Sequence, residues 1–594
     1  MKEKFYIGIN FGFNASACLV SNEKGIIAAI SQERLNGEKN TKKLPIDAVV
    51  KCCEIANVKK VESVVYSHYQ TLSIDELFCY ADELSRSRML LFPNLSAEEL
   101  FVILVNYEGI EVNDKKMQRV EHHTAHEFSA FGIYGKQDKY VSITSDGFGD
   151  GISGRITIND GKKEKVISEV KVSNSVALVY QFVTGALGYK MHQHEGKITG
   201  LAAFGKPKYF YNLLNLFEIN NDDFGNFLNL RKENAINLLT DEDLKLINSN
   251  WQIKDFKDFQ VLKKSVFKLI DDLKEENALS QDIAASVQEF AEKVTINWIK
   301  EKLYNILENK NLLGKIPCYL AGGLFANVKL NQRVHETKMF SNVYVAPPMG
   351  DEGTCVGAVL KVIYDNENKI VNKKNITENV FVGTKIERYE KEVYNFLNLD
   401  KNKSMCSFDI YDEDEMIEKI ADSLANKKIV CFCKDRMEFG PRALCHRSIL
   451  YDCTDATVND WLNKQLGRTE FMPFAPVMHE KHFKELFENT NGAEDTSRFM
   501  TITFDCKDEF VLNYPAACHV DNTARPQIVN EETDLYMSKI LEKYEKKTKK
   551  KVLINTSFNL HNYPIIEDPF IAISSWLKSN TDILIIGNFF IKRR

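Results

Sequence analysis

Apolar positions along the first two thirds of the chain follow two alternating patterns. Short apolar runs bounded by glycine or polar residues predict strands, whereas apolar residues spaced three and four apart predict helices. The first 31 residues predict three strands joined by short turns, which together form a β-meander. A predicted helix at 45–58 and a predicted strand at 61–68 are followed by predicted helices at 74–84 and 97–107.

The same alternation continues through the middle of the chain. A predicted helix at 121–134 precedes the strand YVSITS and the glycine-rich turn DGFGDG, and a long amphipathic helix is predicted at 280–307. Two strand–turn–helix units follow, IPCYLAGGLFANVKL and VYVAPPMGDEGTCVGAV. Strands that alternate with helices predict an α/β architecture with ligands at the C-terminal ends of the strands. The polar, irregular stretch 222–256 predicts an insertion or lid.

A change in composition divides the chain. The stretch 366–392 is polar and rich in lysine and asparagine, which predicts a linker between a domain of residues 1–365 and a domain of residues 393–594. A chain of 594 residues is too long for one hydrophobic core, so more than one domain is expected on length alone.

Composition and charge exclude several classes of protein. The hydrophobic fraction of 44% and the charged fraction of 27% are ordinary for a globular protein, and the net charge of −6 argues against a dominant nucleic-acid surface. The sequence contains no apolar run of about 20 residues and no signal peptide at its start, so we expect a cytoplasmic protein without a membrane partner. The thirteen cysteines include no C-x-x-C pair, which predicts reduced, mostly buried thiols.

Histidines and aspartates gather around the segment HHTAH. His122 and His126 are four residues apart and project from the same face of a helix, so both imidazoles can reach one metal ion. Asp146 and Asp150 follow the strand YVSITS, and Asp351 begins a helix after a second strand. Two imidazoles with carboxylates form a nitrogen–oxygen ligand set, so the sequence predicts a metal site that is open to substrate. The alternative is a solvated helix start beside a polar turn.

Arginines mark the C-terminal part of the chain. Arg436, Arg442 and Arg447 lie around a Gly-Pro turn, which predicts a cradle for phosphate or carboxylate because a guanidinium group pairs with such oxygens bidentately. Surface salt bridges are the alternative, although they do not explain the apolar neighbours of these arginines. In the N-terminal part, Gly322 and Gly323 follow a strand at a point where a backbone would lie close to a nucleotide. The run KKTKKK is interpreted as a solvated helix end rather than an RNA-binding patch.

Nine motifs occur in the order found in one known family. They are HHTAH, SDGFGDG, EGKITGLAAFG, AGGLFANVKLN, PPMGDEG, DRMEFGPRAL, RTEFMPFAPV, HVDNTARPQ and NTSFN. Over nearly its whole length the chain resembles the NodU/CmcH family of O-carbamoyltransferases, which includes nodulation, cephamycin and tobramycin carbamoyltransferases. The resemblance implies an α/β (α+β overall) protein with an N-terminal actin-like domain (ASKHA, TsaD-like) followed by a YrdC-like α/β domain.

The resemblance also implies a reaction. The C-terminal domain is expected to form carbamoyl adenylate from carbamoyl phosphate and ATP with Mg²⁺. The N-terminal domain is expected to pass the carbamoyl group to a hydroxyl of a small molecule, such as a natural product or a sugar, with a divalent metal, iron in much of the wider group, at the transfer site. The region 206–260 is expected to build the acceptor pocket. No nucleic-acid partner is expected, and a homodimer is compatible with this interpretation.

Matching positions in these motifs imply roles for individual residues. The implied metal ligands are His122, His126, Asp146 and Asp351. The implied catalytic residues are Lys39 in the transfer site and, in the adenylate-forming site, Arg436, Arg442 and Ser557. The implied cofactor-binding residues are Gly322, Gly323, Asn327, Arg447 and Arg525.

Two positions depart from the family pattern. The first loop reads Gly12-Phe13-Asn14 where the family usually has Gly-His-Asp, so an imidazole is replaced by an apolar ring and a carboxylate by an amide. The motif GRTEFMPF is one residue shorter than the common form, which leaves Gly467 where a cation is expected beside Arg468.

Two alternative functions stay open. One is an adenylate-dependent ligase of the same fold that transfers to nitrogen or uses another acyl group, which the change at Phe13 and Asn14 permits. The other is a non-catalytic, RNA-associated protein, suggested by KKTKKK and by the tRNA-modifying relatives of the family. If the first loop faces the acceptor, Phe13 favours an acceptor with an apolar surface beside its nucleophile over a polycationic aminoglycoside.

Overall fold

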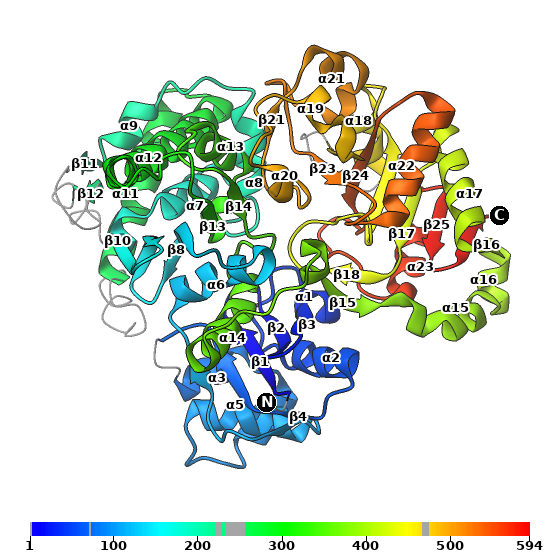
Figure 1. Ribbon diagram of the computed structural model, residues 1–594, viewed down its shortest axis with the longest axis horizontal. Coiled ribbons are helices and arrows are strands. Elements are labelled where there is room, and N and C mark those ends of the chain that lie inside the picture. The colour runs from blue at the N-terminus through cyan, green and yellow to red at the C-terminus, as the bar shows by residue number, and fades with distance from the viewer. Residues whose placement is uncertain (1–2, 70–72, 220–227, 232–255, 466–473) are drawn as a thin grey trace.

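The structure, a computed structural model, describes residues 3–69, 73–219, 228–231, 256–465 and 474–594. Two five-stranded sheets with their helices form the N-terminal part, and an eight-stranded sheet forms the C-terminal part (Figure 1). The predicted lid at 222–256 falls almost entirely outside the described residues, as do Gly467 and Arg468. The α/β architecture predicted from the sequence is confirmed.

The predicted β-meander is confirmed in the first sheet. Strands β1, β2 and β3 pair antiparallel, and β5 and β7 continue the sheet in parallel on the other side of β1, in the order β3-β2-β1-β5-β7. The strands are β1 (Phe5–Asn10), β2 (Ser16–Ser21), β3 (Gly25–Ser31), β5 (Ser63–Tyr66) and β7 (Gln118–Arg119). Helix α2 (Ile46–Ala56) packs on β2 and β3, and α5 (Ala97–Tyr107) packs on α2.

The helix predicted at 74–84 is in fact two helices. They are α3 (Ile74–Tyr80) and α4 (Glu83–Met89). The carboxylate of Asp82 accepts a hydrogen bond from the amide of Ser85 (2.7 Å) and starts the second helix. A side-chain cap of this kind competes with continuation of the preceding helix, which explains the break.

The second sheet repeats the plan of the first. Strands β8, β9 and β10 pair antiparallel, and β13 and β14 extend the sheet in parallel from β8, in the order β10-β9-β8-β13-β14. The strands are β8 (Lys139–Gly149), β9 (Ile152–Asp160), β10 (Glu164–Lys171), β13 (Cys318–Ala321) and β14 (Val343–Val345). The helices of this lobe include α7 (Val176–Ala186), α8 (Glu195–Ala202), α11 (Phe256–Glu275), α12 (Ser280–Asn309) and α13 (Val328–Glu336). A sheet plan that occurs twice agrees with the expected actin-like fold.

Two helices join the two lobes at the centre of the N-terminal part (Figure 1). Helix α6 (His122–Tyr134) packs on β8 and β13 of the second sheet, whereas α14 (Asp351–Glu367) packs on β1 and β2 of the first. A Cβ atom added to Gly357 of α14 would lie 1.7 Å from the carbonyl oxygen of Ala125 in α6. The two helices therefore approach as closely as their backbones allow, and they carry the site described below.

The C-terminal sheet has the strand order β16-β26-β25-β17-β19-β24-β20-β23. On one face, Val430 and Phe432 of β17 pack with α17 and α22, and on the other face Cys431 and Cys433 pack with α23. The strands are β16 (Cys406–Ile410), β17 (Val430–Cys433), β19 (Ser448–Asp452), β20 (Ala475–His479), β23 (Gln527–Val529), β24 (Val552–Ser557), β25 (Ile583–Ile586) and β26 (Phe589–Arg593). The helices are α17 (Glu413–Ala425), α22 (Leu535–Thr548) and α23 (Pro569–Lys578).

The stretch 366–392, predicted as a linker, contains ordered structure. Strand β15 (Phe381–Lys385) lies within it and pairs antiparallel with β18 (Arg436–Glu438), and β15 also packs on β3 of the first sheet. This stretch is therefore built into the junction between the N-terminal and C-terminal parts. The division of the chain into domains at these boundaries stays a prediction.

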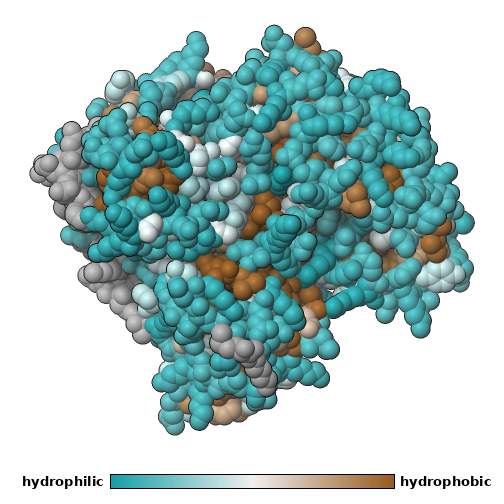
Figure 2. All heavy atoms as spheres, viewed as in Figure 1, coloured by the Kyte–Doolittle hydropathy of each residue, from teal (hydrophilic) through white to brown (hydrophobic). Residues whose placement is uncertain are grey.

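The cysteines and the lysine run have the surroundings expected from the sequence. All thirteen cysteines are free, and ten of them are buried. Helix α22 ends within the run KKTKKK, where Lys550 pairs with Asp452 (2.6 Å) and Lys551 with Glu509 (2.8 Å). Hydrophilic residues cover most of the face seen in Figure 2. Across the described ranges, no helix combines the length and the apolarity that a membrane span requires.

Candidate active site

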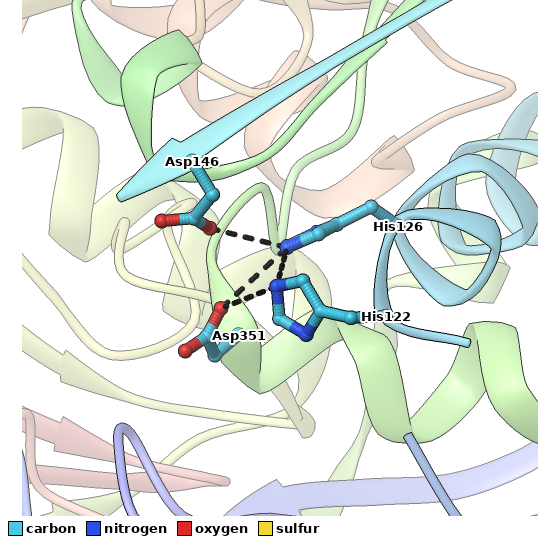
Figure 3. A group of neighbouring side chains, drawn as sticks. All are labelled: His122, His126, Asp146 and Asp351. Atoms are coloured by element: carbon cyan, nitrogen blue, oxygen red, sulfur yellow. Dashed lines mark hydrogen bonds and ion pairs between the residues drawn. The ribbon is translucent and has the colours of Figure 1, made fainter. Parts of the chain in front are cut away.

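Four side chains from three elements converge between the two lobes of the N-terminal part (Figure 3). His122 and His126 lie one turn apart on α6, Asp146 lies on β8, and Asp351 is the first residue of α14. Both imidazoles are fully buried, and the two carboxylates are partly buried. The structure thus brings together the four residues that the sequence and the family resemblance both single out as metal ligands.

The spacing of these atoms suits ligands of one metal ion. Nε2 of His126 lies 3.0 Å from Nε2 of His122 and 3.1 Å from Oδ2 of Asp146. Oδ1 of Asp351 lies 3.6 Å and 3.5 Å from the Nε2 atoms of His122 and His126. This oxygen is buried and has no hydrogen-bond partner among the described residues, so a cation would satisfy it. Metal bonds of about 2.0–2.2 Å place neighbouring ligand atoms about 3 Å apart, so the group fits a divalent metal ion.

The protonation states of His126, Asp146 and Asp351 depend on one another. Burial opposes protonation of His126, but its close contacts with the carboxylates of Asp146 and Asp351, and their charges, outweigh burial and raise the pKa of His126 to about 9. Burial alone would raise the pKa of Asp146, but the hydrogen bond from His126 and the imidazole charges lower it. Burial and the charge of Asp146 raise the pKa of Asp351. A divalent cation competes with the proton on His126, because metals bind imidazole and carboxylate in their deprotonated forms.

The start of α6 is held by two carboxylates. Glu121 accepts hydrogen bonds from the amides of His123 (3.1 Å) and Thr124 (2.8 Å), which caps the helix. Asp150 accepts a hydrogen bond from the amide of His122 (2.8 Å). Asp150, which the sequence places in the same turn as Asp146, therefore orients the helix and does not join the ligand group.

Strand β8 aims Asp146 at the histidines. The strand predicted to end at Ser145 continues to Gly149, with a shift in its pairing with β9 between these two residues. Such bulges re-aim a side chain, and Asp146 lies inside this one. Gly149 packs directly on His122, because an added Cβ would lie 2.0 Å from the Cδ2 atom of the imidazole.

The Gly-Gly turn after β13 supports the same strand. The amide of Gly323 donates to Oδ2 of Asp146 (3.0 Å). Gly322 has a φ angle of 106°, and an added Cβ would lie 2.2 Å from the carbonyl oxygen of Ser145. Asn327 caps α13 and exchanges hydrogen bonds with Gln288 (2.8 and 3.1 Å). These three residues, predicted to bind a cofactor, are thus engaged with β8 and with the helices of the second lobe.

Two of the four predicted arginines bind backbone carbonyl groups. Arg447 is fully buried and donates to the carbonyl oxygens of Thr384, Lys434, Asp435, His446 and Glu567. Arg436 donates to the carbonyl oxygens of Ile27, Val382 and Gly383. These contacts join β3, β15 and the C-terminal sheet. The geometry of Arg436 and Arg447 therefore supports a role in joining these segments, and it offers no support for phosphate binding.

Arg442 and Arg525 lie close enough together for their charges to interact. In the described part of the chain neither guanidinium group forms an ion pair, and the Nε atom of each is buried without a hydrogen-bond partner. Burial lowers the pKa of Arg442 to about 10, and burial together with the charge of Arg442 lowers the pKa of Arg525. Nδ2 of Asn555 holds the two segments together through Gln527 (2.6 Å) and the carbonyl oxygen of Ala443 (3.2 Å). Two guanidinium groups that repel each other create a site that an anion would stabilise.

This arginine pair lies near the ligand group formed by His122, His126, Asp146 and Asp351. Gly440, two residues before Arg442, lies against the loop that leads to Asp351, where an added Cβ would be 3.2 Å from the carbonyl oxygen of Pro347. The charge of Glu352, the residue after Asp351, acts on Arg442. Burial raises the pKa of Glu352 to about 7. The ligand group and the arginine pair are therefore neighbours at the junction between the two parts of the chain.

The first loop joins this site through a chain of hydrogen bonds. Nδ2 of Asn14 donates to Oε2 of Glu352 (3.4 Å), and Oδ1 of Asn14 accepts from Nδ2 of Asn40 (2.9 Å). The amide of Asn40 donates to Glu33 (2.7 Å), and Glu33 pairs with Arg34 (2.9 Å), which donates to the carbonyl oxygen of the Gly-Pro turn (3.1 Å). An amide at position 14 serves one acidic and one amide neighbour, which a carboxylate would not.

Lys39 and Ser557 are the two remaining predicted catalytic residues. Lys39 is exposed in the loop that leads to Asn40. Ser557 ends β24 and its hydroxyl donates to Oδ1 of Asn559 (2.6 Å). Glu352 was not singled out from the sequence, although its position directly after Asp351 in the motif PPMGDEG is a signal that could have found it.

A doubled five-stranded sheet plan, with a polar site between its lobes and a third sheet beside them, defines an actin-like α/β enzyme. The family model described as "Carbamoyltransferase N-terminus" matches residues 6–360, and the one described as "Carbamoyltransferase C-terminus" matches residues 421–593. The chain therefore belongs to the carbamoyltransferase family, as the motifs predicted.

Two nodulation proteins are similar to most of this chain, whereas the overlap with a solved structure is weak. Nodulation protein NolNO of Sinorhizobium fredii is 27% identical over 98% of this chain and 79% of that protein. Nodulation protein NolO of Bradyrhizobium diazoefficiens is 27% identical over 80% of this chain and 79% of that protein. Among solved structures, HypF of T. kodakarensis is 15% identical, covers 63% of this chain and 49% of that chain, and has a TM-score of 0.32. An overlap at this TM-score carries no functional argument.

Proposed function

We propose that this carbamoyltransferase is ATP-dependent, forms carbamoyl adenylate from carbamoyl phosphate and ATP, and transfers the carbamoyl group to a hydroxyl of a small molecule. The observation that carries the proposal is the pair Arg442 and Arg525, which lies half-buried near Asp351 and forms no ion pair with any described residue. Carbamoyl phosphate, ATP and the adenylate are anions that supply the missing charge.

The two guanidinium groups define the orientation of the intermediate. They bind the phosphate of the adenylate, so its carbamoyl carbon lies toward the loop of Asp351 and Glu352. When the acceptor oxygen bonds to this carbon, the bond between the carbon and the phosphate oxygen breaks, and AMP leaves with the electron pair. Arg442 and Arg525 stabilise the charge on the departing phosphate. Side chains from both parts of the chain line the site, and exclusion of water there protects an intermediate that water would decompose.

We further propose that His122, His126, Asp146 and Asp351 hold a divalent transition metal, which the family resemblance suggests is iron. When bound, such an ion acts as a Lewis acid on phosphoryl or carbonyl oxygen. The chain itself orients the ligands: Glu121 and Asp150 fix the start of α6, and the amide of Gly323 holds Asp146. Second contacts of this kind set the geometry and basicity of the ligands.

Pyrophosphate release tests the first half of the reaction. Wild-type protein should release pyrophosphate from ATP only when carbamoyl phosphate is added. Arg442→Met and Arg525→Met should each reduce this release by about 100-fold or more, because the loss of one charge-assisted contact in a closed site costs about 3 kcal/mol. Arg86→Met, which alters an exposed arginine on α4, is the matched control and should leave the rate unchanged.

The acceptor decides between the proposed function and its alternative. Labelled carbamoyl phosphate with ATP should label hydroxyl compounds. Label that enters amines and not hydroxyls would identify an N-carbamoyl ligase. Pyrophosphate release that is independent of carbamoyl phosphate, or that survives in both arginine variants, would overturn the adenylate mechanism.

A further inference from the structure

An exposed imidazole lies beside the first loop of the site. The ring of His192 packs against the ring of Phe13 with centroids 4.2 Å apart, and its Nε2 atom lies 2.8 Å from Nε2 of Gln181. The backbone of His192 has a φ angle of 65°, in the left-handed region, and its amide donates to Oε1 of Glu195 (2.5 Å). Backbone strain of this kind concentrates at functional sites. Both the backbone and the ring of His192 are therefore fixed, although the residue lies in a loop.

The first contact links His192 to the ligand strand. Gln181 projects from α7 beside Gly147, where an added Cβ would lie 4.0 Å from its Oε1 atom. Gly147 directly follows the ligand Asp146, and the charge of Asp146 acts on His192.

The second contact links His192 to the other side of the site. Phe13 directly precedes Asn14, which donates to Glu352 beside the ligand Asp351. The charged group on this side that acts on His192 is Lys42, whose Nζ atom lies 5.2 Å from the centre of the Phe13 ring. His192 therefore lies between Gln181, which adjoins the strand of Asp146, and the first loop, which contacts Glu352 beside Asp351.

The proposed transfer needs a group that takes the proton of the acceptor. A neutral imidazole can take a proton, and partial desolvation together with the charge of Lys42 lowers the pKa of His192 to about 4, so its ring is neutral at neutral pH. His122 and His126 face the ligand group, His123 bonds to Thr144 of the second sheet (3.0 Å), and His68 stacks on His122 (4.5 Å). His192 differs from these four, because it is exposed and its Nδ1 atom has no hydrogen-bond partner within the described residues.

We propose that His192 contacts the acceptor and takes the proton from its hydroxyl; this inference rests on the proposed function. The acceptor oxygen bonds to the carbamoyl carbon, the bond to the adenylate phosphate breaks with its electron pair on AMP, and the proton passes to Nδ1 of His192. A half-turn of the Gln181 amide brings Oε1 to Nε2–H and stabilises the tautomer with Nδ1 free.

The neighbours of His192 also indicate the class of acceptor. Phe13 offers a flat apolar face and Lys42 a positive charge beside the imidazole. A neutral or anionic hydroxylated ring compound fits these neighbours, because a sugar-like ring stacks on an aromatic face. A polycation would be repelled by Lys42.

A substitution that keeps the backbone isolates the imidazole. His192→Asn is suitable because asparagine adopts the left-handed region readily. Two reactions are measured with ATP and carbamoyl phosphate: the burst of pyrophosphate, and the release of AMP with water or methyl glucoside as the hydroxyl probe. His192→Asn should keep the burst within about twofold and lower AMP release by about 100-fold, the usual contribution of a general base. The acid limb of the wild-type pH–rate profile, where His192 becomes protonated, should disappear.

A second substitution tests the same role from the neighbouring position. Because the rings at 13 and 192 are in contact, Phe13→His places an imidazole next to the lost one. The double variant Phe13→His/His192→Asn should recover at least about tenfold of the AMP release. Gln193→Ala, at an adjacent exposed side chain on the same loop, is the control and should behave as wild type.

The outcomes separate this inference from the proposed function. AMP release at the wild-type rate in His192→Asn overturns the role of His192. Equal loss of the pyrophosphate burst and of AMP release also overturns it, because the loop would then be structural. A wild-type protein without a burst that depends on carbamoyl phosphate overturns the proposed function, and this inference with it. If methyl glucoside is not carbamoylated, the release of AMP by water reports the same proton transfer.

Discussion

At the scale of single residues, the HHTAH segment contains two proposed metal ligands, His122 and His126, and one histidine, His123, that packs on the second sheet. His122 and His126 direct their Nε2 atoms to the ligand group, whereas His123 uses both ring nitrogens on Thr144 (3.0 Å) and Ile152 (3.3 Å) of the second sheet. We expect His122→Ala/His126→Ala to lose the bound metal ion. His123→Ala should keep the ion but lower the free energy of unfolding by about 1–3 kcal/mol, because a buried hydroxyl loses its partner and a cavity remains.

Metal analysis of the purified variants, combined with urea unfolding, checks both halves of this prediction. Full metal occupancy in the double variant would refute the ligand assignment. Loss of metal in His123→Ala without any loss of stability would refute the separation of roles.

At the scale of secondary-structure elements, one glycine sets the distance between β8 and α6. Gly149 touches the His122 imidazole, so Gly149→Ala should displace this ligand and weaken metal affinity by about tenfold or more, as loss of ligand orientation does elsewhere. Gly147→Ala is the matched control in the same strand, because its added Cβ meets Leu178 at an ordinary 3.4 Å. Metal titration of both variants decides the matter, and equal affinities would contradict the prediction.

The elements themselves differ in how well the sequence predicts them. The meander β1–β3 and helix α12 follow from periodic apolar positions, because each buries one face against a neighbour. The bulge at Asp146 has no such signal, since its geometry depends on pairing with β9. Strand β15 was hidden within a polar stretch because its partner β18 lies far along the chain.

The site shows the same division. The spacing of His122 and His126 on one helix is a local signal, so the sequence alone suggests a shared ligand. Arg436, Arg442 and Arg447 look alike in sequence, yet only their partners in space distinguish them: Arg436 and Arg447 bind carbonyl groups, and Arg442 does not. A role that depends on which acceptors surround a guanidinium group is decided by tertiary structure.

At the scale of the whole molecule, the junction between its parts contains a buried ion pair that responds to pH. The His446 ring stacks on Phe381 of β15 (4.0 Å), and its Nε2 atom lies 3.6 Å from Oδ2 of Asp534. Burial opposes protonation of His446, but the contact with Asp534 outweighs it and raises the pKa of His446. A raised pKa stabilises the fold fully below the unfolded value of about 6.5, and this stability is lost as pH rises through the folded pKa.

We therefore expect the free energy of unfolding to fall as pH rises above about 6.5, by about 1.4 kcal/mol for each unit by which the pKa is raised. His446→Phe, which retains a ring for stacking on Phe381, should flatten this part of the curve, and Asp534→Asn should do the same. Urea unfolding from pH 6 to 9 measures the slope. A slope that is unchanged in both variants would rule out this ion pair as its source.

The way Arg436 and Arg447 hold the junction has an evolutionary consequence. Both guanidinium groups bind backbone carbonyl oxygens, which every amino acid presents. Substitutions at Ile27, Val382 or Thr384 can therefore accumulate without breaking these contacts, and no compensating change is required at the arginines. Across many related sequences, Arg436 and Arg447 should therefore be invariant and have no co-varying partners. Methods that infer contacts from correlated substitutions would overlook this junction, although both arginines form several hydrogen bonds across it.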